Sequence, residues 1–199
     1  MARLLVGFLC KKVGLMLSDL NRELFLYINA DSTTSSVIIE IARVLSEAPL
    51  FLLALLIARV LYRDRREIIP LGFLMGSTAM IALSLSKVLG ILLPVDRPFV
   101  TGLGNQWLYH SPDPSFPSDH ATLLFAIAAA CMIRSSWRRV GALAVILGFL
   151  NGWARIAVGI HYPYDIAGAF VLSFFCGALV WVGASITKPY AINVLGQKN

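Results

Sequence analysis

The chain has 199 residues, of which 58% are hydrophobic and only 14% are charged, and its mean hydropathy is +0.76. Soluble domains of this length are far more polar, so the composition excludes a soluble protein and indicates an integral membrane protein. The net charge of +6 comes from Lys and Arg in short loops beside apolar segments. That placement is typical of membrane topology and argues against nucleic-acid binding.

The N-terminal part of the chain contains an apolar run that is too short to span a membrane. Residues 1–15 have basic residues on both sides of this run and no small-residue cleavage site, so we expect an N-terminal extension and not a signal peptide. Residues 16–28 alternate polar and apolar side chains at helical spacing, which predicts an amphipathic helix in the membrane interface. Residues 16–199 are then expected to form one membrane-embedded domain.

Five apolar segments predict an all-α integral membrane protein with about five transmembrane helices. We expect these helices over residues 37–62, 68–93, 121–133, 140–153 and 166–186. Cys131 and Cys176 fall inside them, and the odd total of three cysteines shows no paired spacing. We therefore interpret the cysteines as small core side chains and not as disulfides or metal ligands.

The first of these segments also carries charge. Glu40, Arg43 and Glu47 stand at i, i+3 and i+7, so the Arg can pair with either Glu on one face of a continuous helix. The favoured interpretation is a self-neutralised helix end near the lipid head groups. The alternative is a polar face that lines an entrance or touches a head group.

Basic loops predict the topology of the bundle. Residues 63–66 and 134–139 are rich in Arg, and Lys188 follows the last apolar segment, so these ends are expected to face the cytoplasm. Alternation along the chain then places residues 94–120 and 154–165 together on the opposite side. The sequence therefore predicts that the polar residues of these two segments converge.

Three cations are candidates for binding an anion at this end. Lys87 lies near the end of its predicted helix, Arg97 follows that helix, and Arg155 ends the fourth helix. Three cations in one apolar mouth favour a multiply charged anion, and guanidinium groups suit phosphate oxygens. For Lys87 alone, the alternative is a side chain that snorkels to the head groups.

Two histidines are candidates for phosphoryl-transfer chemistry. Asp165 follows His161 by four residues and can accept a hydrogen bond from one ring nitrogen, which leaves the other free as a nucleophile. His120 lies in the predicted first turn of a helix, where free backbone N–H groups attract anions and an imidazole can act as general acid. His110 has no comparable neighbours in the sequence, and we assign it no role.

These residues form a pattern in three parts. Lys87 and Arg97-Pro98 make the first part, Pro117-Ser118-Asp119-His120 the second, and Arg155, His161 and Asp165 the third. The pattern resembles the signature of the type 2 phosphatidic acid phosphatase superfamily, over roughly residues 16–186. The segment from Pro94 to Val100 and the one from Phe116 to His120 are similar to the bacitracin-resistance branch of undecaprenyl pyrophosphate phosphatases.

The resemblance implies a role for each matching residue. It implies His161 as the nucleophile that forms a phosphohistidine, Asp165 as its partner, and His120 as acid and then base. The expected phosphate-binding residues are Lys87, Arg97, Ser118, Asp119 and Arg155. Asp119 either caps its helix or tunes His120. No metal or other cofactor is implied.

Three positions depart from the superfamily pattern. Nine residues separate Lys87 from Arg97 where six are common, Asp119 stands where Gly is usual, and Ala154 stands where Ser is frequent. The Asp does match the bacitracin-resistance branch.

The implied activity is hydrolysis of undecaprenyl diphosphate to undecaprenyl phosphate, which recycles a bacterial cell-wall lipid carrier. The implied partners are the polyprenyl diphosphate and the bilayer, and the implied location is the bacterial inner membrane with an extracytoplasmic site. Alternatives are a phosphatidylglycerophosphate or phosphatidic acid phosphatase, a lipid A phosphotransferase, or a non-enzymatic lipid-binding protein. Residues 107–109 are interpreted either as a lid or as aromatic membrane anchors. Nothing in the sequence specifies an oligomeric state.

Overall fold

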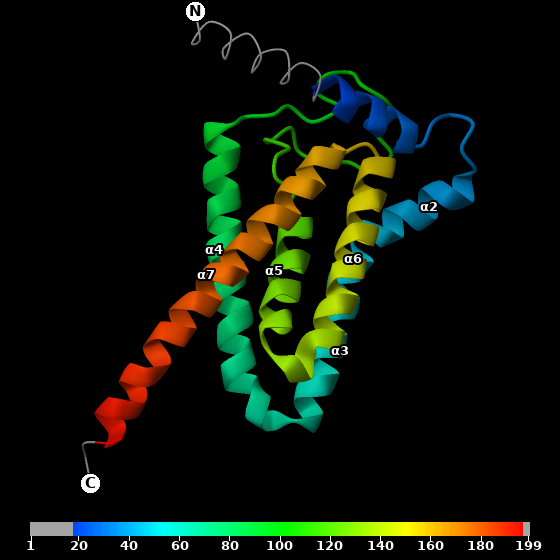
Figure 1. Ribbon diagram of the computed structural model, residues 1–199. Helices are drawn as coiled ribbons and strands as arrows, with labels where there is room; N and C mark the ends of the chain where they lie inside the picture. The colour runs from blue at the N-terminus through cyan, green and yellow to red at the C-terminus, as the bar shows by residue number, and fades with distance from the viewer. Residues whose placement is uncertain (1–17, 197–199) are drawn as a thin grey trace, which may run out of the picture.

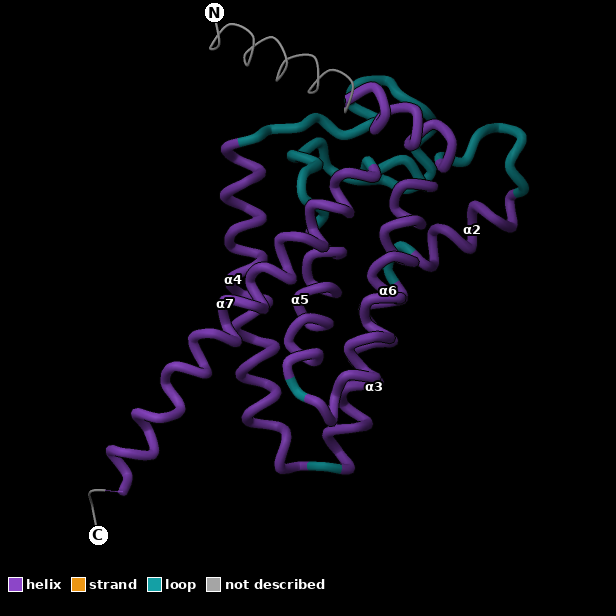
Figure 2. Tube along the Cα trace, in the orientation of Figure 1, coloured by secondary structure: helices purple, strands orange, loops and turns teal. Residues whose placement is uncertain are grey.

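A computed structural model describes residues 18–196. In this range the chain is helical, with no strand, and its helices form a bundle whose two ends are closed by loops (Figures 1 and 2). The all-α fold class is therefore confirmed. The proposed extension over residues 1–15 lies outside the described residues.

The predicted amphipathic helix is present over residues 18–28. It buries Phe25, whose ring lies 5.4 Å from the ring of Tyr162, and it leaves Leu20, Leu24 and Tyr27 exposed. Asn21 Oδ1 accepts a hydrogen bond from the Tyr164 backbone N–H at 3.0 Å. The helix thus packs across the loop end of the bundle, above the turn that carries His161 (Figure 1).

The prediction of one continuous helix over residues 37–62 is wrong. Two helices, α2 (Ser36–Leu45) and α3 (Ala48–Arg63), meet at a bend of 45°. Pro49 lies in the first turn of α3, and proline cannot donate the hydrogen bond that a continuous helix needs there. The carbonyl of Ser46 accepts a hydrogen bond from Asn151 Nδ2 at 2.6 Å.

The other predicted helices are present with shifted ends. They are α4 (Ile68–Leu92), α5 (Asp119–Ile133), α6 (Arg138–Ala157) and α7 (Pro163–Gly196), and short 3-10 turns (η1, Arg65–Glu67, and η2, Ser135–Trp137) precede α4 and α6. Within residues 18–196, three segments are long and apolar enough to span a membrane, and the bent pair α2 and α3 makes a fourth candidate. The 15-residue α5 rises only about 22 Å, less than the hydrocarbon core of a bilayer.

The short helix α5 forms the centre of the bundle. It packs against α4, α6 and α7, and most of its residues are buried (Figure 1). Its sequence is rich in alanine, and small side chains allow helix backbones to approach closely in a membrane protein. On α6, a Cβ at Gly148 would lie 2.4 Å from the ring of Phe125, so glycine is required at this contact. The first turn of α5, which carries His120, is therefore held by packing on several sides.

The loops lie at the two ends as the basic residues predict. The α3–α4 turn and the α5–α6 turn share one end, and residues 94–118 lie with the α6–α7 turn at the other (Figure 2). The α6–α7 turn contains Gly159 at φ +84°, where a Cβ would lie 2.0 Å from the Asn105 carbonyl oxygen. Only glycine fits this close approach, which ties the turn to the long loop.

Candidate functional site

The α6–α7 turn and the first turn of α7 place His161 and Asp165 together. His161 Nδ1 lies 3.1 Å from Asp165 Oδ2, and both side chains are only 2% exposed. The same carboxylate oxygen accepts hydrogen bonds from the Tyr162 backbone N–H at 2.7 Å and from the Ser115 hydroxyl. Asp165 is thus held by donors from two segments, and it can orient the imidazole as the spacing predicts.

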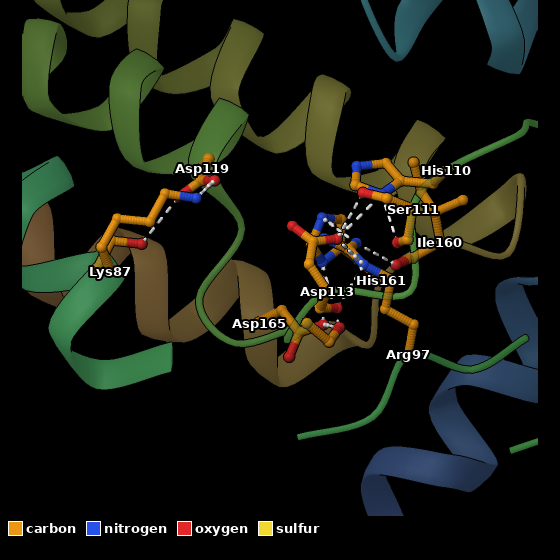
Figure 3. A network of polar contacts seen from close by, with 11 residues as sticks. Lys87, Arg97, His110, Ser111, Asp113, Asp119, Ile160, His161 and Asp165 are labelled. Atoms are coloured by element: carbon orange, nitrogen blue, oxygen red, sulfur yellow. Dashed lines mark hydrogen bonds and ion pairs between the residues drawn. The ribbon is translucent and has the colours of Figure 1, made fainter. Parts of the chain in front are cut away.

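Arg97 contacts the other ring nitrogen of His161. Its Nη1 lies 3.1 Å from His161 Nε2 and donates to the Ile160 carbonyl at 2.9 Å, as Figure 3 shows. A guanidinium only donates hydrogen bonds, so Nε2 must be the acceptor and the ring proton must be on Nδ1, facing Asp165. This tautomer leaves a lone pair on Nε2, which a nucleophile requires.

The surroundings of His161 also keep its ring neutral. Burial lowers the pKa of His161 to about 4; Asp165 opposes this shift, while the positive charges of Arg155 and Arg97 add to it. A neutral imidazole is the form that can attack an electrophile.

Two other predicted phosphate-binding residues are buried near this centre and have unpaired donors. Arg155, on α6, is 1% exposed, and its Nη1 donates to the Ser46 carbonyl and to Glu47 Oε1, both at 3.1 Å. Arg155 Nε and the Ser118 hydroxyl lack a protein partner within the described chain. Buried donors normally have partners, so these two fit an anion that binds at this position.

His120 lies in the first turn of α5, one residue after the helix begins. Its Nε2 lies 3.1 Å from Glu47 Oε2, at the break between α2 and α3. Glu47 therefore contacts two predicted site residues, His120 and Arg155. The sequence does not reveal this role, because a single continuous helix would keep Glu47 beside Arg43.

The prediction that Glu40, Arg43 and Glu47 neutralise one another holds for Glu40 and Arg43 but not for Glu47. Arg43 pairs with Glu40, and its Nε donates to the Trp107 carbonyl at 2.7 Å. Glu47 does not take part, since the break turns it toward α5 and α6. Trp107 is also bonded to Ala30 and to Val158 by its own N–H groups, so residue 107 fastens the loop to the bundle.

The structure does not bring Lys87 into the cluster around His161. Lys87 Nζ pairs with Asp119 Oδ2 at 2.6 Å, and Figure 3 places this pair apart from Arg97 and His161. Asp119 also accepts a hydrogen bond from Ser86 at 3.1 Å. Two departures from the superfamily pattern, the position of Lys87 and the Asp at residue 119, thus occur in the two partners of one ion pair. A cavity of about 250 Å³ lies beside it, between α4 and residues 113–117.

A further residue of the long loop, Asp113, contacts the site and was not predicted. Asp113 pairs with Arg97 Nη2 at 3.1 Å, and its backbone carbonyl accepts from Arg97 Nε at 3.0 Å. Burial opposes ionisation of Asp113, but Arg97 and the Ser111 hydroxyl outweigh it and lower its pKa. The ring of His110 lies 6.3 Å from the ring of His161. The sequence assigns no role to His110, whose Nδ1 lies 3.0 Å from the Ser111 carbonyl oxygen and 3.4 Å from Asp113 Oδ1.

The described residues contain no group of three or more His, Cys, Asp or Glu side chains that could hold a metal ion. The cluster is instead built from two histidines, two buried guanidinium groups and the carboxylates that pair with them. Such a set can bind a phosphate and offer it an imidazole nitrogen.

Comparison with known proteins agrees with this chemistry. Residues 67–186 match the PAP2 superfamily. A putative undecaprenyl-diphosphatase of Escherichia coli is 32% identical over 83% of this chain and 85% of its own length. An undecaprenyl-diphosphatase of Bacillus subtilis is 30% identical over 86% and 88%.

Two solved structures have a similar fold. The phosphatidylglycerolphosphate phosphatase of Bacillus subtilis superposes with a TM-score of 0.63 at 17% identity, over 87% of this chain and 88% of that one. Aquifex aeolicus LpxE superposes with a TM-score of 0.59 at 23% identity, over 81% and 94%. At these identities the likeness concerns the fold alone. The family match and the relatives that cover most of the chain together show that this chain is a membrane phosphatase of the PAP2 superfamily.

Proposed function

We propose that the protein hydrolyses undecaprenyl diphosphate to undecaprenyl phosphate through a phosphohistidine on His161. The observation that carries the proposal is the orientation of the His161 ring, with Asp165 on Nδ1 and a cation on Nε2. The substrate class comes from the two undecaprenyl-diphosphatases that match nearly the whole chain.

In the first step, the Nε2 lone pair of His161 attacks the terminal phosphorus, and the bond to the bridging oxygen breaks. His120 gives its proton to the leaving lipid monophosphate. Arg97 and Arg155, with the Ser118 hydroxyl, neutralise the equatorial oxygens. Arg97 Nη1 has to pass from Nε2 to a phosphate oxygen, which frees the lone pair as the substrate enters.

In the second step, water attacks the phosphohistidine, and the phosphorus–nitrogen bond breaks. The neutral His120 takes a proton from this water, so inorganic phosphate leaves and both histidines return to their starting forms. All groups in the two steps are side chains of this chain, and we propose that the reaction needs no metal ion.

The test is phosphate release from undecaprenyl diphosphate by the purified protein in detergent with EDTA. Phosphatidylglycerophosphate and phosphatidic acid serve as parallel substrates, and lipid A serves as an acceptor. We expect EDTA-resistant release with the diphosphate preferred. Release only from the glycerolipids would assign another substrate, transfer only to lipid A would indicate a phosphotransferase, and loss of activity with EDTA would overturn the metal-free mechanism.

The proposed location is the bacterial inner membrane, with the site on the extracytoplasmic side. The support is the Arg-rich end of the bundle, which lies opposite the site and is expected to face the cytoplasm. A cysteine at Tyr109, which is 90% exposed at the site end, should react with a membrane-impermeant maleimide in spheroplasts, while a cysteine at Arg66 should not. The reverse pattern would place the site on the cytoplasmic side.

A further inference from the structure

Glu47 lies outside the three-part sequence pattern, yet its carboxylate joins two residues of the site. Oε2 lies 3.1 Å from His120 Nε2, and Oε1 lies 3.1 Å from Arg155 Nη1. Its side chain is 49% exposed, whereas that of Arg155 is 1% exposed. Glu47 therefore reaches from the surface of the site to a buried cation and to the proposed general acid.

The backbone fixes the position of this carboxylate. The preceding residue, Ser46, is buried, and its carbonyl accepts from Asn151 at 2.6 Å and from Arg155 at 3.1 Å. Pro49 stands in the first turn of the next helix and keeps the chain broken at this point. The obvious competing partner, Arg43, is bound to Glu40. The contact between Glu47 and His120 thus follows from the way the α2–α3 break docks on α6.

We propose that Glu47 is the positioning residue of His120 in the phosphoryl-transfer reaction, an inference that rests on the proposed function. Its carboxylate holds the Nε2–H side of the imidazole, directs Nδ1 toward the leaving oxygen, and stabilises the imidazolium that donates the proton. The arrangement parallels that of the nucleophile, since Asp165 holds the ring nitrogen of His161 that does not react.

The charges around His120 explain why a carboxylate is needed there. Burial and the positive charge of Arg155, from α6, lower the pKa of His120, while Glu47 and Asp119 oppose this shift. Asp119 is already paired with Lys87 of α4. Glu47 is therefore the carboxylate in direct contact with the ring, and its removal leaves the imidazolium facing Arg155 with less compensation.

The experiment compares Glu47→Gln with the matched control Glu40→Gln, which removes the neighbouring carboxylate on the same segment. We expect Glu47→Gln to lower kcat for the diphosphate by about 10- to 100-fold, at or below the low end of general acid–base contributions, because Glu47 acts through His120. The alkaline limb of the kcat–pH profile should move to lower pH, and Glu47→Asp should restore part of this shift. Glu40→Gln should leave the profile unchanged.

A second measurement does not depend on the substrate. The chain has only three histidines, so NMR titration of the protein with labelled histidine resolves His120 once His110→Gln and His120→Gln assign the signals. We expect Glu47→Gln to move the His120 titration to lower pH. An unmoved titration would overturn the role of Glu47. A moved titration in a protein that hydrolyses none of the lipids would overturn the proposed function alone.

Discussion

Replacing His161 by Ala is expected to abolish phosphate release, with a fall in kcat on the order of 10⁴-fold or more, the scale seen when a catalytic nucleophile is removed. The reason is structural. Among the described ring nitrogens, His161 Nε2 is the one whose lone pair faces a buried guanidinium, and Asp165 fixes its tautomer. Release of phosphate and the amount of acid-labile phosphoenzyme formed from labelled diphosphate measure the effect.

The matched control is His110→Ala, because the His110 ring lies 6.3 Å from that of His161 and has its own contact with Asp113. We expect this variant to keep its phosphoenzyme. His161→Ala should remain folded in detergent, since α5, α6 and α7 pack through other residues, and its thermal unfolding should stay cooperative. Turnover like that of the unmodified protein in folded His161→Ala would remove the nucleophile assignment.

Replacing Asp165 by Asn is expected to lower kcat by about 10³- to 10⁴-fold, although the side chain keeps its size. The Asp165 Oδ2 atom accepts from Tyr162 N, from Ser115 and from His161 Nδ1. An Asn carbonyl oxygen at this position can accept from the same three donors, but it carries no negative charge. The positive charge that develops on the His161 ring as Nε2 attacks phosphorus therefore loses its compensation.

The rate of phosphoenzyme formation in a single turnover measures this effect directly. Ser115→Ala is the matched control, because it removes one donor to Asp165 and leaves the negative charge beside His161 in place. We expect a loss of less than tenfold in that variant. A comparable loss in Ser115→Ala and Asp165→Asn would indicate that Asp165 acts through the loop and not through its charge.

Hydropathy predicted most of the bundle, because a helix that crosses a bilayer must be apolar along its length. The ends of α4 and α5 lie within two residues of their predicted positions. The break at Ser46 and Glu47 was missed, because apolar residues continue on both sides of it. Pro49 was the local signal, but proline is tolerated in membrane helices, so its effect here depends on Asn151 and Arg155 as partners of the freed carbonyl.

Some contacts of the site could likewise be predicted from the sequence, and others could not. Short spacing along the chain predicted the pair His161 and Asp165, and alternation of the helices predicted that Arg97 and Arg155 come to the same end. The contact of Glu47 with Arg155 spans 108 residues, and that of Asp113 with Arg97 joins two points of an irregular loop. Neither contact has a periodicity that the sequence could reveal.

The sequence by itself therefore determined that the protein lies in a membrane, how its apolar segments follow one another along the chain, and which chemistry the polar residues beside these segments can perform. These follow from composition and from local spacing, which are properties of the chain alone. The tertiary structure decided which carboxylate meets which cation: Glu47 with Arg155 and His120, Asp119 with Lys87, and Asp113 with Arg97. The physical reason is that a charged side chain pairs with the partner that helix packing brings within hydrogen-bond distance, and packing depends on all the helices together.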